Sequence, residues 1–132
     1  MRLRGFFDIK RFLKFSVVGA SGVIVNLGLL YVFVRFLGLN KFLSGALAIE
    51  LSILNNFFWN NLWTWRERRA ESVLLRLFKY NLATASTSAL GNYVVFAFLL
   101  RLGLNYLLAD LIGIGVAVII NFLLSDRWVF KG

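Results

Sequence analysis

The chain has 132 residues, of which 60% are hydrophobic, 17% aromatic and 16% charged, and its formal net charge is +9. A soluble domain carries roughly a quarter charged residues, so this chain has too few polar groups to cover a globule in water. Its aromatic content excludes a disordered chain. It contains no Cys and no His, which removes thiolate metal sites, Cys nucleophiles and the commonest general base.

Four apolar runs are each long enough for a transmembrane helix, which needs about 20 residues to cross a hydrocarbon core of roughly 30 Å. None alternates with a period of two, so they predict helices rather than barrel strands. The predicted spans cover about 15–34, 42–63, 80–100 and 106–125. Tight turns containing a glycine join the first two and the last two spans. The longer middle connection is polar and ends in an amphipathic stretch at 72–79.

Positive charge is distributed unevenly over the ends of these spans. Twelve of the 15 Lys and Arg residues lie in the N-terminal segment, the middle connection and the C-terminal segment, and only Arg35, Lys41 and Arg101 lie on the other side. Because basic loops stay in the cytoplasm, we expect both termini to be cytoplasmic and the chain to be a multi-pass protein of the cell inner membrane. Residues 1–10 mix basic and aromatic residues, which favours a segment lying in the membrane interface.

The chain matches itself in a single register, which aligns position 11 with position 76. The letters RFLKF at 11–15 fall on RLFKY at 76–80, GLN at 38–40 falls on GLN at 103–105, and NF at 56–57 falls on NF at 121–122. We therefore predict one membrane domain over 1–132 with repeats at about 11–66 and 76–131. Each repeat contains two spans and returns the chain to its starting side, so the fold expected is all-α, with four transmembrane helices as two parallel two-helix repeats.

Three motifs give the sequence a family resemblance. The basic-aromatic lead-in RFLKF, the Gly-rich first span VVGASGVIVN and the end of the fourth span, NFLLSDRWVFKG, make the chain similar to the GtrA family. The resemblance implies a four-span membrane protein that serves cell-surface polysaccharide synthesis by flipping polyprenyl-phosphate-linked sugars. Similar domains are fused to polyprenyl-phosphate glycosyltransferases, which implies such an enzyme as a partner.

Basic and aromatic residues gather at the predicted cytoplasmic ends of the spans. The basic ones act either as snorkelling anchors or as donors that capture a lipid phosphate. The tryptophans belong either to the usual interfacial belt or to a surface that stacks on a sugar. The candidates for phosphate binding are Arg11, Lys14, Arg76, Lys79 and Arg127, and the candidate interface aromatics are Trp63 and Trp128.

Polar residues inside the apolar runs are the second set of candidates. Asn side chains within a membrane act as bundle-forming hydrogen-bond partners or as substrate contacts. Glu50 is the strongest candidate among them, because a carboxylate inside a membrane costs free energy and is a functional candidate by default. It pairs with Arg35 or Arg101, binds and releases a proton, or contacts sugar hydroxyls. The predicted polar cavity consists of Glu50, Asn56, Asn121, Asn26 and Asn92.

These residues are compatible with three functions. The first is translocation of a polyprenyl-phosphate-linked sugar across a membrane, and the second is a non-transporting scaffold that recruits a polyprenyl-phosphate glycosyltransferase. The third is a small proton-coupled exporter, which the basic ends of the spans disfavour. No enzyme activity, cofactor, metal site or nucleic-acid partner is expected, since no nucleophile–base spacing or acidic cluster is visible. Membrane lipid is an expected partner, and a homodimer suits four helices with little interior.

Overall fold

The computed structural model describes residues 8–131, and in this range the chain is helical. Four helices are long and apolar enough to cross a membrane: Ile9–Arg35, Lys41–Thr64, Val73–Arg101 and Tyr106–Val129. The prediction of four spans is therefore confirmed. The first and third helices begin about two turns before the predicted spans, because the amphipathic segments that precede them continue the same helices. Residues 1–7, most of the predicted interfacial segment, lie outside the described residues.

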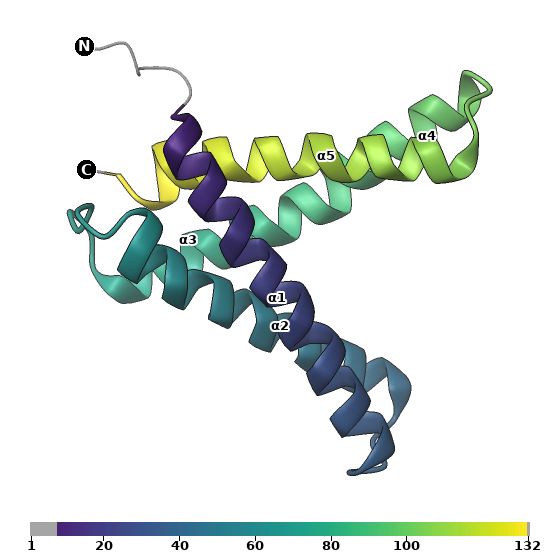
Figure 1. Ribbon diagram of the computed structural model, residues 1–132, viewed down its shortest axis with the longest axis horizontal. Coiled ribbons are helices and arrows are strands. Elements are labelled where there is room, and N and C mark those ends of the chain that lie inside the picture. The colour runs from purple at the N-terminus through teal and green to yellow at the C-terminus, as the bar shows by residue number, and fades with distance from the viewer. Residues whose placement is uncertain (1–7, 132) are drawn as a thin grey trace. The chain divides into compact units, whose positions relative to one another are not determined.

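The chain divides into two compact units, the first ending at Glu67 and the second beginning at Arg68. Each unit is a helical hairpin (Figure 1). The first contains α1 (Ile9–Arg35) and α2 (Lys41–Trp59), which continues as the π-helix η2 (Asn60–Thr64). In the second, α3 (Val73–Ser86), the π-helix η3 (Thr87–Asn92) and α4 (Tyr93–Arg101) form one long helix. It is followed by α5 (Tyr106–Leu124) and the π-helix η4 (Ser125–Val129).

Capping residues fix the ends of the helices in the first unit. Asp8 accepts a hydrogen bond from the backbone N–H of Arg11 and so begins α1. The turn after α1 depends on Gly38, whose φ of 66° is a left-handed conformation that favours glycine. Asn40 then begins α2, because its Oδ1 accepts from the backbone N–H groups of Phe42 (2.7 Å) and Leu43 (3.1 Å).

The second unit uses the same devices at its turn. Gly103 has a φ of 90°, and its N–H donates to the carbonyl of Leu100 at 3.0 Å. The N–H of Leu104 donates to the carbonyl of Leu99 at 3.1 Å, which completes a Schellman-type helix end. Asn105 then caps α5, because its Oδ1 accepts from the backbone N–H groups of Leu107 (2.9 Å) and Leu108 (3.2 Å). The glycine-containing turns predicted at 35–41 and 101–105 are thus confirmed.

Close backbone approach holds the two helices of each hairpin together. In the first unit, a Cβ at position 22 would overlap the side-chain amide of Asn56, so Gly22 of α1 leaves the space that Asn56 of α2 fills. In the second unit, a Cβ at position 113 of α5 would lie 2.6 Å from Oδ1 of Asn92, so Gly113 has the corresponding function. Small residues at crossings are the usual way in which membrane helices approach closely.

Three π-helical segments belong to the long helices of the described chain: η3 lies within the third helix, and η2 and η4 end the second and the fourth. The segments η2 and η4 begin at positions that the repeat register aligns, and they end alike. The N–H of Trp65 donates to the carbonyl of Asn60 at 2.9 Å, and that of Phe130 donates to the carbonyl of Ser125 at 2.8 Å. The segment η3 has no counterpart in α1, which is α-helical from Ile9 to Arg35. π-Helical turns are rare and occur frequently at functional sites.

Candidate functional site: a basic pocket in the first hairpin

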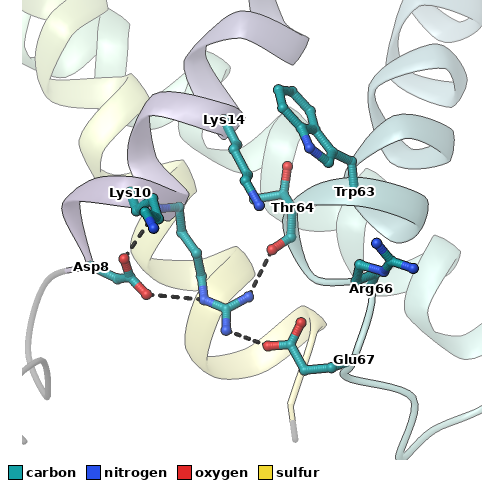
Figure 2. A pocket seen from close by; sticks show the side chains of 8 residues that line it. Asp8, Lys10, Lys14, Trp63, Thr64, Arg66 and Glu67 are labelled. Atoms are coloured by element: carbon teal, nitrogen blue, oxygen red, sulfur yellow. Dashed lines mark hydrogen bonds and ion pairs between the residues drawn. The ribbon is translucent and has the colours of Figure 1, made fainter.

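A pocket of about 210 Å³ lies where α1 begins and η2 ends, at the open end of the first hairpin. We call it the basic pocket. Figure 2 shows that residues from the start of α1 face residues from the end of η2 and the loop that follows. Its lining carries four cationic side chains, two anionic ones, a tryptophan and a threonine. The lining residues are Asp8, Lys10, Arg11, Lys14, Trp63, Thr64, Arg66 and Glu67.

Arg11 ties the two walls of the basic pocket together. Its Nη1 donates to the backbone carbonyl of Thr64 at 2.7 Å, and its Nε donates to Oδ2 of Asp8 at 3.2 Å. Its guanidinium also forms an ion pair with Glu67. Both carboxylates of the pocket therefore contact Arg11, which joins α1 to the end of η2 and to Glu67 after it. Arg11 was predicted to bind phosphate, and in the structure its donors already serve protein acceptors.

The other three cations of the basic pocket have no carboxylate partner among the described residues. Lys10, Lys14 and Arg66 make no ion pair with any residue from 8 to 131. Lys14 is half-buried, and its Nζ lies 5.5 Å from the ring centroid of Trp63, within the range of a cation–π interaction. The pocket therefore presents positive charge that residues 8–131 do not neutralise. Lys10 and Arg66 contribute to the charge bias that predicts the orientation, but they are not among the site residues predicted from the sequence.

The second hairpin carries a matching lysine with a different partner. Lys79, which the repeat register aligns with Lys14, lies 5.4 Å from the ring centroid of Trp128. Its Nζ also donates to both carboxylate oxygens of Glu71, at 2.7 and 2.9 Å. The hydrogen bond from Lys79 holds the pKa of Glu71 below its ordinary value of 4.5. A carboxylate therefore neutralises Lys79, whereas none of the described carboxylates pairs with Lys14.

The remaining basic candidates lie in the second hairpin. Arg76 is 4% exposed and its Nε donates to the backbone carbonyl of Glu71 at 3.1 Å. Arg127 is exposed on η4. Its neighbour Asp126 accepts from Arg68 at 2.9 Å, an ion pair that the sequence did not predict. The structure thus brings Arg11, Lys14 and Trp63 to one pocket of the first unit, and gathers Arg76 and Lys79 around Glu71 in the second.

Aromatic side chains close the end of each hairpin. Phe15 meets the ring of Trp65 edge-on, with centroids 5.8 Å apart, and Trp65 is fully buried. In the second hairpin Tyr80 meets Phe130 edge-on at 6.1 Å. The repeat register aligns each member of the first pair with a member of the second. Edge-to-face pairs of this kind contribute on the order of 1 kcal/mol beyond the area that they bury.

An apolar groove of about 570 Å³ adjoins the basic pocket. Trp63 lines both, so the groove begins at the ring over which Lys14 lies. We call it the tryptophan groove. One wall comes from α1 and the other from the end of α2 and η2: Val17, Val18, Ser21, Trp59, Leu62 and Trp63. A charged pocket beside an apolar groove suits a molecule with an anionic head and a hydrocarbon tail.

Amides lie where the tryptophan groove reaches the helix crossing. The Nδ2 of Asn55 donates to the Oγ of Ser21 at 3.1 Å and to Oδ1 of Asn56 at 3.3 Å. Asn56 itself fits against Gly22. It therefore packs where α1 and α2 approach, and its two predicted roles, bundle-forming hydrogen bonding and substrate contact, stay predictions. Asn55 was not among the predicted site residues.

The other residues of the predicted polar cavity lie apart from this crossing or in the second unit. Glu50 is exposed on α2, and Asn26 is half-buried on α1. In the second unit, the Oδ1 atoms of Asn92 and Asn121 are buried without a hydrogen-bond partner in the part of the chain that the structure describes. Buried amide oxygens without partners are costly and indicate a missing donor. A cavity shared by all five residues stays a prediction.

Comparison with known proteins defines the family. The GtrA/DPMS transmembrane domain family matches residues 14–131, so the chain belongs to it and is a multi-pass membrane protein. A dolichol-phosphate mannosyltransferase of Pyrococcus furiosus is 48% identical to the chain over 118 residues, which are 86% of this chain and 33% of that protein. The chain therefore spans about a third of the length of the curated relative that it matches. The resemblance to the GtrA family is confirmed.

Proposed function

We propose that this protein binds a polyprenyl-phosphate-linked sugar at the basic pocket and carries its headgroup across the membrane. The observation that carries the proposal is the set of three cations, Lys10, Lys14 and Arg66, that have no carboxylate partner among residues 8–131. They lie beside a groove that suits a hydrocarbon chain. Membership of the GtrA/DPMS family and the name of the mannosyltransferase relative support a ligand of this class.

The phosphate is assigned to the three uncommitted cations. Ammonium groups bind phosphate as point charges, and a guanidinium adds directed donors. Arg11 acts differently in this proposal. By pairing with Asp8 and Glu67 it neutralises the two carboxylates that line the pocket and would otherwise repel the anion. The pocket volume of about 210 Å³ suits a phosphate or diphosphate group and its hydration rather than a whole lipid.

The isoprenoid chain is assigned to the tryptophan groove. Its first atoms leave the phosphate beside Trp63, and the groove then offers Trp59 and Val17 as apolar walls. The tail stays in a hydrocarbon environment throughout, so only the polar head meets an energetic barrier on crossing the bilayer. Asn55, Asn56 and Ser21 offer that head its first polar groups within the membrane.

The orientation and the duplication belong to the same proposal. The distribution of Lys and Arg favours cytoplasmic termini, which puts the basic pocket at the inner face of a cytoplasmic membrane. Contacts at aligned positions of the two halves, Lys14 with Trp63 and Lys79 with Trp128, support two parallel repeats. In the second repeat Glu71 neutralises Lys79. In this proposal only the first repeat therefore binds the phosphate.

A scaffold for a glycosyltransferase is the second candidate. It is favoured by the length of the relative, since the chain matches only a third of a protein named as a mannosyltransferase. In that case the basic pocket would present the lipid phosphate to a separate enzyme without moving it. In either candidate the chain itself performs no catalysis.

Transfer into liposomes separates the two candidates. The purified protein is reconstituted with a polyprenyl-phosphate-linked sugar on one leaflet, and the headgroup that becomes accessible on the other leaflet is measured. We expect transfer that depends on the protein and falls in the variant Lys10→Ala/Lys14→Ala/Arg66→Ala. Protein-free liposomes and a polyprenol without phosphate are the controls. Tight binding of the phosphate lipid without transfer would favour the scaffold, and no binding would refute both.

A further inference from the structure

A second cationic cavity lies at the opposite end of the first hairpin. It occupies about 700 Å³ next to the turn at Gly38, and we call it the turn-end pocket. Its charged residues are Arg35, the last residue of α1, and Lys41, the first residue of α2. Its walls are mainly apolar and include Leu27, Leu30 and Val34, while Tyr31 adds an aromatic ring with a polar tip.

Neither cation of the turn-end pocket is neutralised by a residue that the structure describes. Arg35 and Lys41 form no ion pair with any residue between 8 and 131. The sequence left open a pairing of Glu50 with Arg35, and the described part of the chain does not contain it. The turn-end pocket therefore resembles the basic pocket in its chemistry, since both present unneutralised cations beside apolar walls.

The spacing of the two pockets matches the membrane. Lys14 and Arg35 lie on one uninterrupted α-helix, and their separation along it corresponds to about 32 Å at a rise of about 1.5 Å per residue. The hydrocarbon core is roughly 30 Å thick. The two cationic positions of α1 are thus far enough apart for one to meet each headgroup layer of a bilayer.

Membrane anchoring alone does not explain the pair of cations. Basic residues on the outer side oppose the charge bias that orients the chain, so two of them beside one cavity carry a topological cost. The second hairpin shows that one is enough: Arg101 ends α4, and Tyr106 begins α5 at the position that corresponds to Lys41. The additional cation is specific to the hairpin that also carries the unneutralised basic pocket.

We propose that the turn-end pocket is a second binding site for the phosphate of the same polyprenyl-phosphate lipid, at the other membrane face. The inference rests on the proposed function, and it adds that the α1–α2 hairpin contains both the loading and the receiving site. Arg35 and Lys41 hold the phosphate after the head has crossed. Leu27, Leu30 and Val34 face the first part of the tail.

Binding stoichiometry tests this site directly. Wild-type protein in nanodiscs is titrated with a polyprenyl phosphate, and bound lipids are counted by native mass spectrometry. We expect two phosphate lipids per chain in the wild type and one in Arg35→Ala/Lys41→Ala, while Arg101→Ala keeps two. The charge-retaining variant Arg35→Lys/Lys41→Arg is expected to keep the second lipid, which would exclude misfolding as the cause of the loss.

Transfer in liposomes and competition complete the test. The double alanine variant is expected to transfer the headgroup about tenfold more slowly, as the loss of a charge-assisted contact predicts.

Inorganic phosphate and phosphatidylglycerol are offered as competitors. Displacement of the second lipid by phosphatidylglycerol at equal concentration would overturn the proposal and indicate general lipid anchoring. Unchanged stoichiometry and transfer in the double variant would overturn it while leaving the basic pocket in place. Failure of the basic pocket itself is recognised separately, by a Lys14→Ala variant that still binds both lipids.

Discussion

Glu71 holds the ammonium group of Lys79 with both carboxylate oxygens, at 2.7 and 2.9 Å. Lys14 occupies the corresponding position in the first hairpin and forms no ion pair with a described residue. Both lysines lie about equally far from a tryptophan ring, at 5.5 Å for Lys14 and 5.4 Å for Lys79. At this position the two hairpins therefore differ in whether a carboxylate neutralises the lysine, and this difference determines where an anion is expected to bind.

Lys14→Ala should weaken the binding of a polyprenyl phosphate by about tenfold or more, because a charge-assisted hydrogen bond contributes about 1.5–3 kcal/mol. Lys79→Ala should change this affinity by less than about threefold, since it removes a charge that Glu71 already neutralises. Equilibrium binding of a fluorescent polyprenyl phosphate in nanodiscs measures both. Equal losses in the two variants would contradict the assignment of the phosphate to the first hairpin.

Glu71→Gln should destabilise the second hairpin in a way that depends on pH. The pKa of Glu71 is lowered by the hydrogen bond from Lys79 and by nearby cations. A lowered carboxyl pKa contributes stability that is fully present above the ordinary value of 4.5 and is lost as the pH falls through the lowered value. Thermal unfolding should therefore show wild type more stable than the variant at pH 7.

The difference between these two proteins should shrink as the pH falls below 4.5, because the wild-type carboxyl then takes up a proton as well. Lys14→Gln is the matched control, since it changes the corresponding lysine position of the first hairpin without touching a carboxylate. A gap between wild type and Glu71→Gln that stays constant down to the lowest pH would contradict the ion pair as the source of stability.

Gly22→Ala should separate α1 from α2. The new Cβ would overlap the amide of Asn56, and forcing atoms into a packed crossing costs typically about 1–3 kcal/mol. Gly19→Ala is the control on the same helix, because a Cβ there has no heavy atom within 4 Å. It should be neutral or stabilising by up to about 1 kcal/mol, as helix propensity predicts. Unfolding in detergent measures both, and similar stability of the two variants would disprove the close approach at Gly22.

Much of this framework could be predicted from the sequence. Runs of apolar residues determine where helices cross a membrane, and the glycines at 38 and 103 mark turns that need a positive φ. The repeat register identified which lysines correspond to each other. Charge counting did not show which carboxylate reaches which cation. Glu71 lies before α3 and meets Lys79 only because Ser72 begins that helix between them. Glu67 reaches Arg11 from a segment 56 residues further along the chain, whereas Asp8 meets it from the preceding turn.

The positions of the intramembrane polar groups were harder to predict. Hydropathy marks Asn56 and Glu50 alike as polar groups inside one span, and only the crossing at Gly22 distinguishes them. Asn56 fills a space between two helices, whereas Glu50 is exposed on α2. The π-helical segments η2, η3 and η4 also had no sequence signal, because the insertion of one residue into a helical turn depends on tertiary contacts rather than on local propensity.

Trp63→Ala should weaken polyprenyl-phosphate binding more than Trp128→Ala does. Trp63 both faces the ammonium group of Lys14 and lines the tryptophan groove, so its removal takes away a cation–π contact and an apolar wall. A loss of roughly three- to tenfold is expected from about 1 kcal/mol for such contacts. Trp63→Phe should recover part of the affinity by restoring the apolar wall. If a polyprenol without phosphate loses affinity equally, the contribution of Trp63 is to the tail alone.

Glu50→Gln should leave the fold intact and slow the transfer of the headgroup. The carboxylate lies within the span Lys41–Thr64, where an acidic side chain is expensive and is a functional candidate by default. Gln keeps the size and most of the hydrogen-bonding capacity of the side chain but cannot be charged. We expect wild-type unfolding and polyprenyl-phosphate binding, because Glu50 is remote from the basic pocket, together with transfer that is slower by roughly tenfold, as the loss of one charge-dependent contact predicts. Leu54→Gln, which adds an amide one turn further along the same helix, controls for general effects of polarity. Transfer at the wild-type rate with Gln at position 50 would show that the charge of Glu50 plays no part in moving the headgroup.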